Sequence, residues 1–274
     1  SEMCIRDSNT TAILPVHCYG IPCDIDKIQK IADVYGLRVI YDAAHAFNVR
    51  KNDISILNHG DLSVLSFHAT KVFNTFEGGA IISHDLKTKQ RIDYLKNFGF
   101  AGETRIVAPG INAKMNEVEA AFGLLQLKHI DKALDERKAI YQRYCEMLAG
   151  LEGLTFVDVP DDVSWNHAYF PVLIEPHFGM SRDGVYELFK ADAILTRRYF
   201  YPLISSFAMY RGFPTSAEEH LPVANDIAGK VLCLPIYPGM TLEEQDRVVN
   251  ALKRASLVGQ AQGNEPTPVT EIAV

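Results

Sequence analysis

A strand–helix–strand pattern near the start of the chain most limits what this sequence can fold into. Residues 12–17 form a short apolar run that predicts a buried strand, although Pro15 cannot donate to a strand ladder. Apolar residues over 24–35 recur at helical spacing, Gly36 ends that helix, and residues 37–41 predict a second strand. Two strands joined by a helix form a βαβ unit, which favours a parallel sheet with helices on its faces.

Beyond this unit, the pattern of elements changes once, near the loop at residues 151–153. The first part continues the α/β pattern, with strands predicted at 62–67 and 79–83, a helix at 86–97 and a long helical region at 116–149. The second part alternates short strands and helices, with strands predicted at 154–157 and 169–174 and helices beginning near Ser181, Ala217 and Thr241. We therefore predict an α/β fold with a mainly parallel large domain over 9–150 and a smaller α+β domain over 151–258.

The two ends of the chain lack a domain pattern. Residues 1–8 resemble the translation of a transposon end used in sequencing-library preparation, so we expect them to be foreign to the native protein. An ordinary disordered terminus is the alternative. Residues 259–274 show little apolar periodicity and are expected to form a flexible tail.

Composition excludes several classes of protein. The chain has 274 residues, 47% hydrophobic and 22% charged, with a net charge of −7. These values argue against a disordered chain and against a nucleic-acid-binding protein with a basic face. No apolar run approaches the ~20 residues that span a bilayer, so no membrane association is predicted. The five cysteines form neither a disulfide framework nor a metal-binding pattern, which is typical of a cytoplasmic protein.

Three short segments carry residues that could act together in catalysis. Asp42 follows a predicted strand, where open α/β sheets bind ligands, although an aspartate that caps a turn is an equal alternative. Lys71 and Ser66, each taken alone, would be a surface lysine and a turn or sheet residue. Together, a lysine can form a Schiff base with an aldehyde cofactor, a carboxylate can keep a pyridine nitrogen protonated, and a hydroxyl can bind a phosphate ester. Gly78 and Gly79 would let the backbone pass close to such a cofactor.

These segments resemble the signatures of the DegT/DnrJ/EryC1/StrS nucleotide-sugar aminotransferases. The resemblance rests on D-A-A-H-A (42–46), S-F-H-A-T-K (66–71) and E-G-G-A-I (77–81), and continues through motifs at 15–20, 110–117, 197–202 and 232–238. Members of this family are pyridoxal-phosphate enzymes of the aspartate-aminotransferase fold. The resemblance thus implies fold type I, with a large domain that is incomplete here and a smaller C-terminal domain.

Within the family, two segments indicate a branch. The runs at 71–77 and 199–202 most resemble the enzymes that aminate dTDP-4-dehydro-6-deoxyglucose at C4, the dTDP-viosamine-forming transaminases. Enzymes that aminate C3 share most of these motifs. The resemblance implies transamination of a keto-6-deoxy sugar nucleotide by glutamate, in bacterial amino-sugar or polysaccharide (O-antigen, lipopolysaccharide) biosynthesis. The alternatives are a 3-keto sugar nucleotide aminotransferase and an inactive or regulatory protein with the same fold.

The resemblance also implies roles for individual residues. Lys71 would form the Schiff base with pyridoxal phosphate and move the reacting proton; relatives with His at this position catalyse dehydration instead. Asp42 would pair with the pyridinium nitrogen, Ser66 would bind the phosphate, and His45 would lie near the ring oxygen. Asn112 would reach the phosphate of the neighbouring subunit, because the family forms its sites at a homodimer interface.

Three further residues are candidates for substrate binding. These are His17, Tyr199 and Tyr201, with a structural histidine and packed aromatic side chains as the alternatives. The resemblance further implies that about a hundred residues or more are missing before residue 10. The missing part would hold the helix N-terminus that binds the phosphate and an aromatic that stacks on the ring. We therefore expect the parent protein to be a transaminase and this polypeptide by itself to be inactive.

Overall fold

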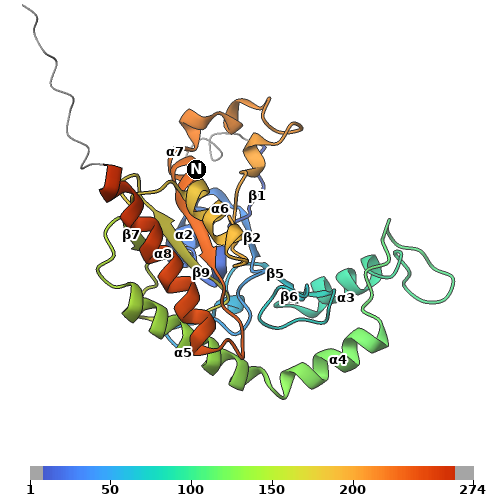
Figure 1. Cartoon of the computed structure of the whole chain (residues 1–274). Coiled ribbons are helices and arrows are strands. Elements are labelled where there is room, and N and C mark those ends of the chain that lie inside the picture. Colours follow the sequence, from blue (N-terminus) through green and yellow to red (C-terminus); the bar gives the residue numbers. More distant parts are fainter. Residues whose placement is uncertain (1–8, 263–274) are drawn as a thin grey trace, which may run out of the picture. The chain divides into compact units, whose positions relative to one another are not determined.

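The computed structural model describes residues 9–262 and divides them into two compact units (Figure 1). The first unit extends to Asp135 and includes Val159–Ala168, and the second comprises Glu136–Asp158 and the residues from Tyr169 onward. The change between units therefore falls earlier than the predicted loop at 151–153. Residues 1–8 and 263–274, which include the predicted foreign segment and most of the predicted tail, lie outside the described residues.

The first unit contains a four-stranded sheet in the order β1-β2-β5-β6. Its strands are β1 (Ala12–Ile13), β2 (Arg38–Asp42), β5 (Leu62–Ser66) and β6 (Gly79–Ser83). The first three are parallel and β6 is antiparallel to β5, so the predicted mainly parallel sheet is confirmed. The strand β1 is shorter than the predicted run at 12–17 because Pro15 has no N–H to donate.

The helix between β1 and β2 begins and ends where the sequence predicts. Helix α2 (Ile25–Tyr35) starts at Asp24, whose side chain accepts a hydrogen bond from the Lys27 N–H at 3.1 Å. It ends at Gly36, which has a left-handed conformation with φ of 66° that suits glycine. The βαβ unit is therefore confirmed, with α2 packed against β2.

The two faces of this sheet differ in character because side chains alternate along each strand. One face is buried: Val39, Tyr41 and Leu65 belong to a core that also includes residues of α2. The opposite face carries Asp42 and Ser66. It also carries half-exposed or exposed apolar side chains, namely Leu14, Val16, Val64 and Ile81.

The rest of the first unit contains a small antiparallel sheet, two helices and two short 3-10 helices. The sheet has the order β4-β3-β8 and consists of β3 (Arg50–Lys51), β4 (Ile54–Ser55) and β8 (Val163–Ser164). It joins the late segment 159–168 to the early part of the chain. The other elements are η1 (Cys18–Gly20), η2 (Ile56–Asn58), α3 (Leu86–Leu95) and α4 (Glu117–Leu127).

The predicted long helical region at 116–149 consists of two helices. Helix α4 begins with the predicted capping box, in which Asn116 and Glu119 exchange side chain–backbone hydrogen bonds. The helix breaks at Lys128–His129, and α5 (Ile130–Leu148) follows. The later part of α5 contributes Tyr144 and Leu148 to the core of the second unit, which is why the division between units falls inside this helix.

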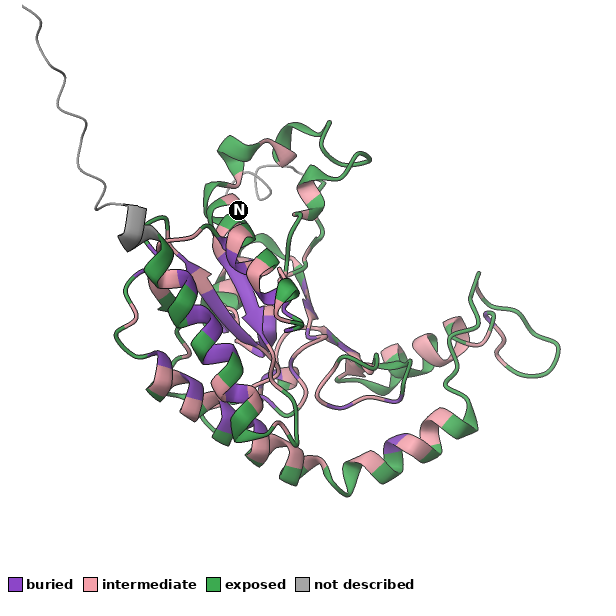
Figure 2. Cartoon of the chain, viewed as in Figure 1, coloured by how far each residue is buried: buried purple, intermediate pink, exposed green. Residues whose placement is uncertain are grey.

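The second unit packs the later part of α5 and three further helices with an antiparallel sheet in the order β10-β9-β7. The strands are β7 (Leu154–Phe156), β9 (Phe170–Ile174) and β10 (Val231–Leu234), and the helices are α6 (Arg182–Ala191), α7 (Pro222–Lys230) and α8 (Leu242–Gln262). Three 3-10 helices lie between α6 and α7, at Ile204–Ser206, Pro214–Ser216 and Glu218–His220. Buried residues line β9, β10 and the inner side of α8 (Figure 2).

The length of α8 and the character of the helices bear on two earlier expectations. Helix α8 continues to Gln262, so the first four residues of the predicted tail are helical. Among residues 9–262, no helix combines the length and the apolar character needed to cross a membrane.

Candidate active site

The ends of two neighbouring parallel strands place the predicted cofactor-binding residues together. Asp42 is the last residue of β2 and Ser66 is the last residue of β5. The register pairs Asp42 with Val64, so Asp42 and Ser66 lie at the carboxyl edge and on the same face of the sheet. This edge is where open α/β sheets bind their ligands.

The backbone around Asp42 is held from both sides. Its N–H donates to the Pro15 carbonyl at 2.9 Å, and its carbonyl accepts from the His17 N–H at 3.0 Å. The half-buried carboxylate accepts a hydrogen bond from the Ala44 N–H at 3.0 Å through Oδ1. Asp42 is therefore positioned by the main chain of its neighbours.

Lys71 lies in the loop that connects β5 to β6. Short hydrogen bonds close this loop, with the Phe67 N–H donating to the Gly78 carbonyl at 2.8 Å and the Ala69 N–H to the Phe76 carbonyl at 2.7 Å. The Lys71 N–H donates to the His68 carbonyl at 2.9 Å. The loop is thus an ordered turn that returns Lys71 towards the strand end.

An aromatic cluster ties this loop to the segment that follows Asp42. Phe73, which is buried, stacks on Phe47 with ring centroids 4.7 Å apart and meets Phe67 edge-on at 4.8 Å. Helix α4 packs on the same loop through Gly123, where an added Cβ would lie 2.8 Å from a Thr75 methyl group. These apolar contacts bring Lys71 and His45 to the same region.

Electrostatic interactions link three of the predicted residues. Burial lowers the pKa of Lys71, and the nearby Asp42 carboxylate opposes that shift. Burial lowers the pKa of His45 to about 4, with a further lowering from Lys71 and an opposing effect of Asp42. Lys71, Asp42 and His45 are therefore close enough to influence one another, and His45 is neutral at pH 7.

His17, a predicted substrate-binding residue, is placed differently. It follows the residue that pairs with Asp42, so its side chain lies on the opposite face of the sheet. There it is fully buried and stacks on Tyr41 at 4.5 Å, and its Nδ1 accepts the Cys23 N–H at 3.0 Å. Burial lowers its pKa to about 4, with Asp42 acting in the opposite direction.

The three other predicted residues lie apart from this constellation along the chain. Asn112 is exposed, and its side-chain oxygen accepts a hydrogen bond from Lys114 Nζ at 2.7 Å. Tyr199 and Tyr201 belong to the second unit. Tyr201 lies beneath the guanidinium groups of Arg182 and Arg198, at 4.7 and 5.7 Å from its ring centroid.

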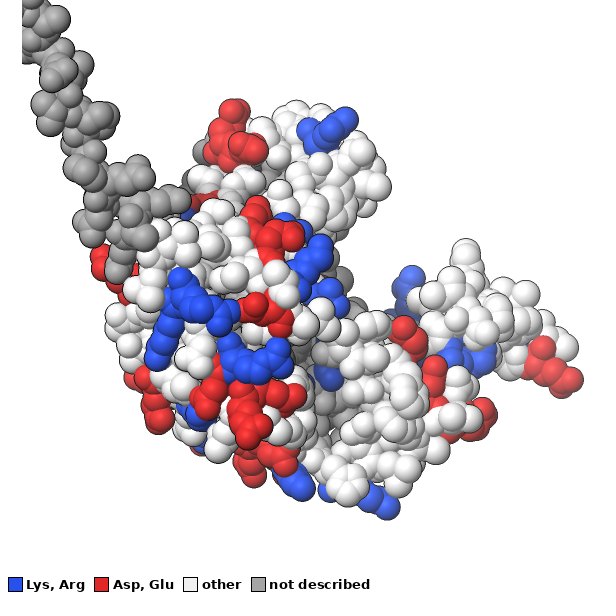
Figure 3. Space-filling view, in the orientation of Figure 1, with Lys and Arg blue, Asp and Glu red and all other residues white. Residues whose placement is uncertain are grey.

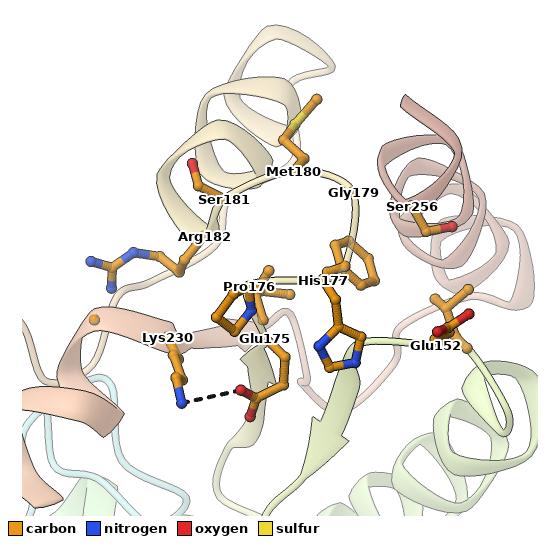
Figure 4. Close-up of a pocket in the computed structure, with 14 residues that line it drawn as sticks. Glu152, Glu175, Pro176, His177, Gly179, Met180, Ser181, Arg182, Lys230 and Ser256 are labelled. Atoms are coloured by element: carbon orange, nitrogen blue, oxygen red, sulfur yellow. Dashed lines mark ion pairs between the residues drawn. The ribbon is translucent and has the colours of Figure 1, made fainter. Parts of the chain in front are cut away.

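A separate cavity of about 820 Å³ lies within the second unit (Figure 4). Glu175, His177 and Lys230 line it, and none of the predicted site residues does. Lys230 forms an ion pair with Glu175 at 3.1 Å, and Arg182 donates to the carbonyls of Ala228 and Val231. Because these cations are already paired with protein groups, the cavity lacks the reactive set found around Lys71.

Two residues near His45 had not been singled out from the sequence. Trp165 and Asn166 lie more than a hundred positions after His45, and both donate hydrogen bonds to the segments around it. Their neighbours in the sequence form no motif that indicates this role. Only the return of segment 159–168 to the first unit brings them there.

Comparisons with known proteins agree with this geometry. The sequence profile of the DegT/DnrJ/EryC1/StrS aminotransferase family matches residues 5–253, a range that includes the last residues of the segment expected to be foreign. The dTDP-4-amino-4,6-dideoxy-D-glucose transaminase of Escherichia coli is 53% identical over 235 residues, which are 85% of this chain and 63% of that protein. The Shigella dysenteriae transaminase of the same name is 48% identical over 89% of this chain and 66% of its own length. The chain therefore spans less than two thirds of these curated relatives.

A solved structure also matches. DesI, determined in the presence of its TDP-sugar product, superposes with a TM-score of 0.87 and 36% identity. The match covers 94% of this chain and 65% of DesI. The predicted fold of the pyridoxal-phosphate sugar aminotransferases is thereby confirmed.

Protonation of the buried histidines should make folding stability depend on pH. The pKa of His17 and of His45 is about 4 in the folded chain against 6.5 for the ordinary group, so the unfolded chain binds more protons between these values. The free energy of unfolding should therefore fall as pH falls from 6.5 to 4, by roughly 2–3 kcal/mol for each histidine. Urea unfolding at several pH values measures this. The His17→Gln variant should lose about half of the histidine-dependent change; an identical pH dependence in both proteins would contradict the assignment.

Proposed function

The chain belongs to the DegT/DnrJ/EryC1/StrS aminotransferase family, and we propose that it supplies the reactive lysine of a transaminase that acts on a keto sugar nucleotide. The observation that carries this proposal is the mutual influence of Lys71, Asp42 and His45 at the carboxyl edge of the sheet. Because the chain spans less than two thirds of its curated relatives, the proposal concerns the activity of the whole protein.

The residues at this edge fit pyridoxal phosphate. A carboxylate, an amine with a lowered pKa, a hydroxyl and a neutral imidazole gather there. In that order, they match the ring nitrogen, the aldehyde, the phosphate and the ring oxygen of pyridoxal phosphate. Gly79 lets strand β6 pack closely on strand β5, because an added Cβ would lie 2.6 Å from the Leu65 carbonyl oxygen. When bound, pyridoxal phosphate supplies an aldehyde that condenses with amines and a ring that withdraws electrons from the reacting carbon.

The chain's own residues then have separate tasks. The lowered pKa of Lys71 increases the share of neutral amine, which is the form that attacks a carbonyl and accepts a proton from the Cα of the amino donor. When the cofactor is bound, Asp42 would hold a proton on the ring nitrogen, and Ser66 with neighbouring N–H groups would bind the phosphate. His45, which is neutral, would be able to donate a hydrogen bond to the ring oxygen without adding positive charge beside Lys71.

The substrate of the proposed reaction is dTDP-4-dehydro-6-deoxyglucose, with glutamate as the amino donor. The names of the two curated relatives support amination at C4. In the second unit, an apolar cavity of about 520 Å³ is lined by Tyr199, Tyr201 and nearby residues. Arg198 lies over Tyr186 and near Tyr201, and its guanidinium is paired with Asp183 at 2.8 Å. The aromatic side chains of this cavity suit stacking with a nucleotide base, so we assign Tyr199 and Tyr201 to substrate binding.

The proposed enzyme is a homodimer, and helix α4 supports this. After its first turn the helix has no charged side chain, and Figure 3 shows its middle as an uncharged surface. Val118, Leu124 and Leu125 are 75%, 66% and 56% exposed and follow helical spacing on the side away from Gly123. An exposed apolar stripe of this kind indicates a protein interface. In this arrangement Asn112, which precedes α4, reaches the phosphate of the neighbouring site.

Lys71 should be the residue that binds the cofactor covalently. The test uses a hybrid protein in which the unmatched part of the E. coli relative is joined to this chain. After incubation with pyridoxal phosphate and reduction with borohydride, peptide mass spectrometry should find the pyridoxyl group on Lys71. The Lys71→Arg hybrid should carry no label at this position, whereas Lys114→Arg, which changes an exposed lysine of the same unit, should be labelled normally. Label spread over several surface lysines would contradict the assignment.

The position of amination distinguishes the two sugar specificities. The same hybrid, supplied with glutamate and dTDP-4-dehydro-6-deoxyglucose, should form a product whose NMR spectrum places nitrogen at C4. The Lys71→Arg hybrid should be at least ~10³-fold slower, because both the amine and the proton-transfer group are lost. Nitrogen at C3 with a 3-keto substrate would support the alternative specificity, and a folded, labelled hybrid with no turnover would support the non-catalytic alternative.

Charge introduced on the α4 stripe should weaken self-association. In sedimentation velocity, the hybrid should be a dimer, and the double variant Val118→Lys/Leu124→Lys should shift towards monomer because burying two charges is unfavourable. Leu86→Lys is the matched control, since Leu86 is 85% exposed at the start of α3. Dimers that persist in the double variant would exclude this face as the interface.

A further inference from the structure

The segment after β8 holds the loop that carries His45. Asn166 is 2% exposed, and its side-chain nitrogen donates to the carbonyls of His45 and Phe47, both at 2.8 Å. Its side-chain oxygen accepts the Ala168 N–H at 3.1 Å. One buried amide therefore uses both of its N–H groups to join residues 119–121 positions apart in the sequence.

Trp165, which precedes Asn166, holds Tyr19, the residue whose N–H bonds to the His45 ring. Trp165 donates from Nε1 to the Tyr19 carbonyl at 2.9 Å, and the Tyr19 N–H donates to His45 Nδ1 at 3.2 Å. Tyr19 has a positive φ of 57°, which is unfavourable for a non-glycine residue and is maintained by surrounding contacts. The hydrogen bond from the Tyr19 N–H to His45 Nδ1 is therefore held at both ends: Trp165 binds the backbone of the donor, Tyr19, and Asn166 binds the backbone of the acceptor, His45.

Close packing at Gly20 connects these two arms. A Cβ at Gly20 would lie 2.7 Å from the His45 carbonyl oxygen, 3.2 Å from Asn166 Oδ1 and 3.3 Å from Trp165 Nε1. Gly20 also has a positive φ of 84°. The absence of a side chain here lets the three segments meet, so the arrangement is specific in shape as well as in hydrogen bonding.

We propose that Asn166, assisted by Trp165, is a positioning residue that sets the tautomer of His45. By holding the His45 backbone where Tyr19 donates to Nδ1, it keeps the ring hydrogen on Nε2 and makes His45 a hydrogen-bond donor through that atom. An imidazole nitrogen that accepts a hydrogen bond carries no hydrogen in the neutral ring, so the other nitrogen must carry it. The significance for catalysis rests on the proposed function, in which His45 donates to the cofactor.

The test reads the His45 ring in the chain itself, without cofactor. Long-range ¹⁵N–¹H NMR of the ¹⁵N-labelled protein at neutral pH reports which ring nitrogen bears hydrogen. In the unaltered chain, His45 should show hydrogen on Nε2. In Asn166→Ala, the ratio of the Nε2–H to the Nδ1–H tautomer should fall about fivefold, the change expected for losing one hydrogen bond to Nδ1. Hydrogen exchange of the Tyr19 amide should become about tenfold faster.

Controls separate positioning from general destabilisation. His17 is an internal reference, because its Nδ1 accepts the Cys23 N–H and is not contacted by Asn166. The matched control is Asn52→Ala, since Asn52 also bonds to segment 159–168, through Asp162 at 3.4 Å, but not to the His45 loop. His17 should keep its original tautomer in every variant. His45 should keep its original tautomer in Asn52→Ala.

Each outcome decides the question. If Asn166→Ala lowers the unfolding temperature but leaves the His45 tautomer unchanged, Asn166 is only structural and the proposal is overturned. If Asn166→Ala does not fold, Trp165→Phe removes the bond to Tyr19, keeps an aromatic ring and leaves Asn166 in place, and it should shift the His45 tautomer in the same direction. No shift there also overturns the proposal. Failure of borohydride to label Lys71 would refute the proposed function while leaving this tautomer result intact.

Discussion

The parallel register of β2 and β5 is the constraint on which the candidate site depends. It pairs Tyr41 with Ser63 and Asp42 with Val64, so that the buried residues of both strands share one face and Asp42 and Ser66 share the other. A shift by one residue would turn Asp42 into the core and expose Tyr41. The cost of burying a carboxylate and exposing a tyrosine makes that alternative strongly unfavourable.

The site then takes its chemistry from the loops that cover this edge. Burial reduces the solvent around Lys71 and His45, and the loss of water favours their neutral forms. The Asp42 carboxylate limits this effect for Lys71. Partial burial beside one carboxylate therefore distinguishes Lys71 from an exposed lysine, which would remain a solvated cation.

Local signals in the sequence account for much of the fold and part of the site. Asp24 and Gly36 define the ends of α2, and the box formed by Asn116 and Glu119 defines the start of α4, because capping uses only neighbouring residues. The break at Lys128–His129 has no such local signal; α4 lies wholly in the first unit, whereas α5 extends from the first unit into the second. Long-range packing placed the division between units inside α5, which composition alone cannot reveal.

The sequence by itself determined the α/β class, the family, and the chemical identity of Asp42 and Ser66 at strand ends and of Lys71 in the loop after β5. These depend on short motifs and on periodicity, which are properties of neighbouring residues. Only the tertiary structure decided that His17 lies on the buried face, that His45 is neutral, and that Trp165 and Asn166 hold its loop. The physical reason is that burial and hydrogen bonding between residues more than a hundred positions apart exist only after the segments have packed together.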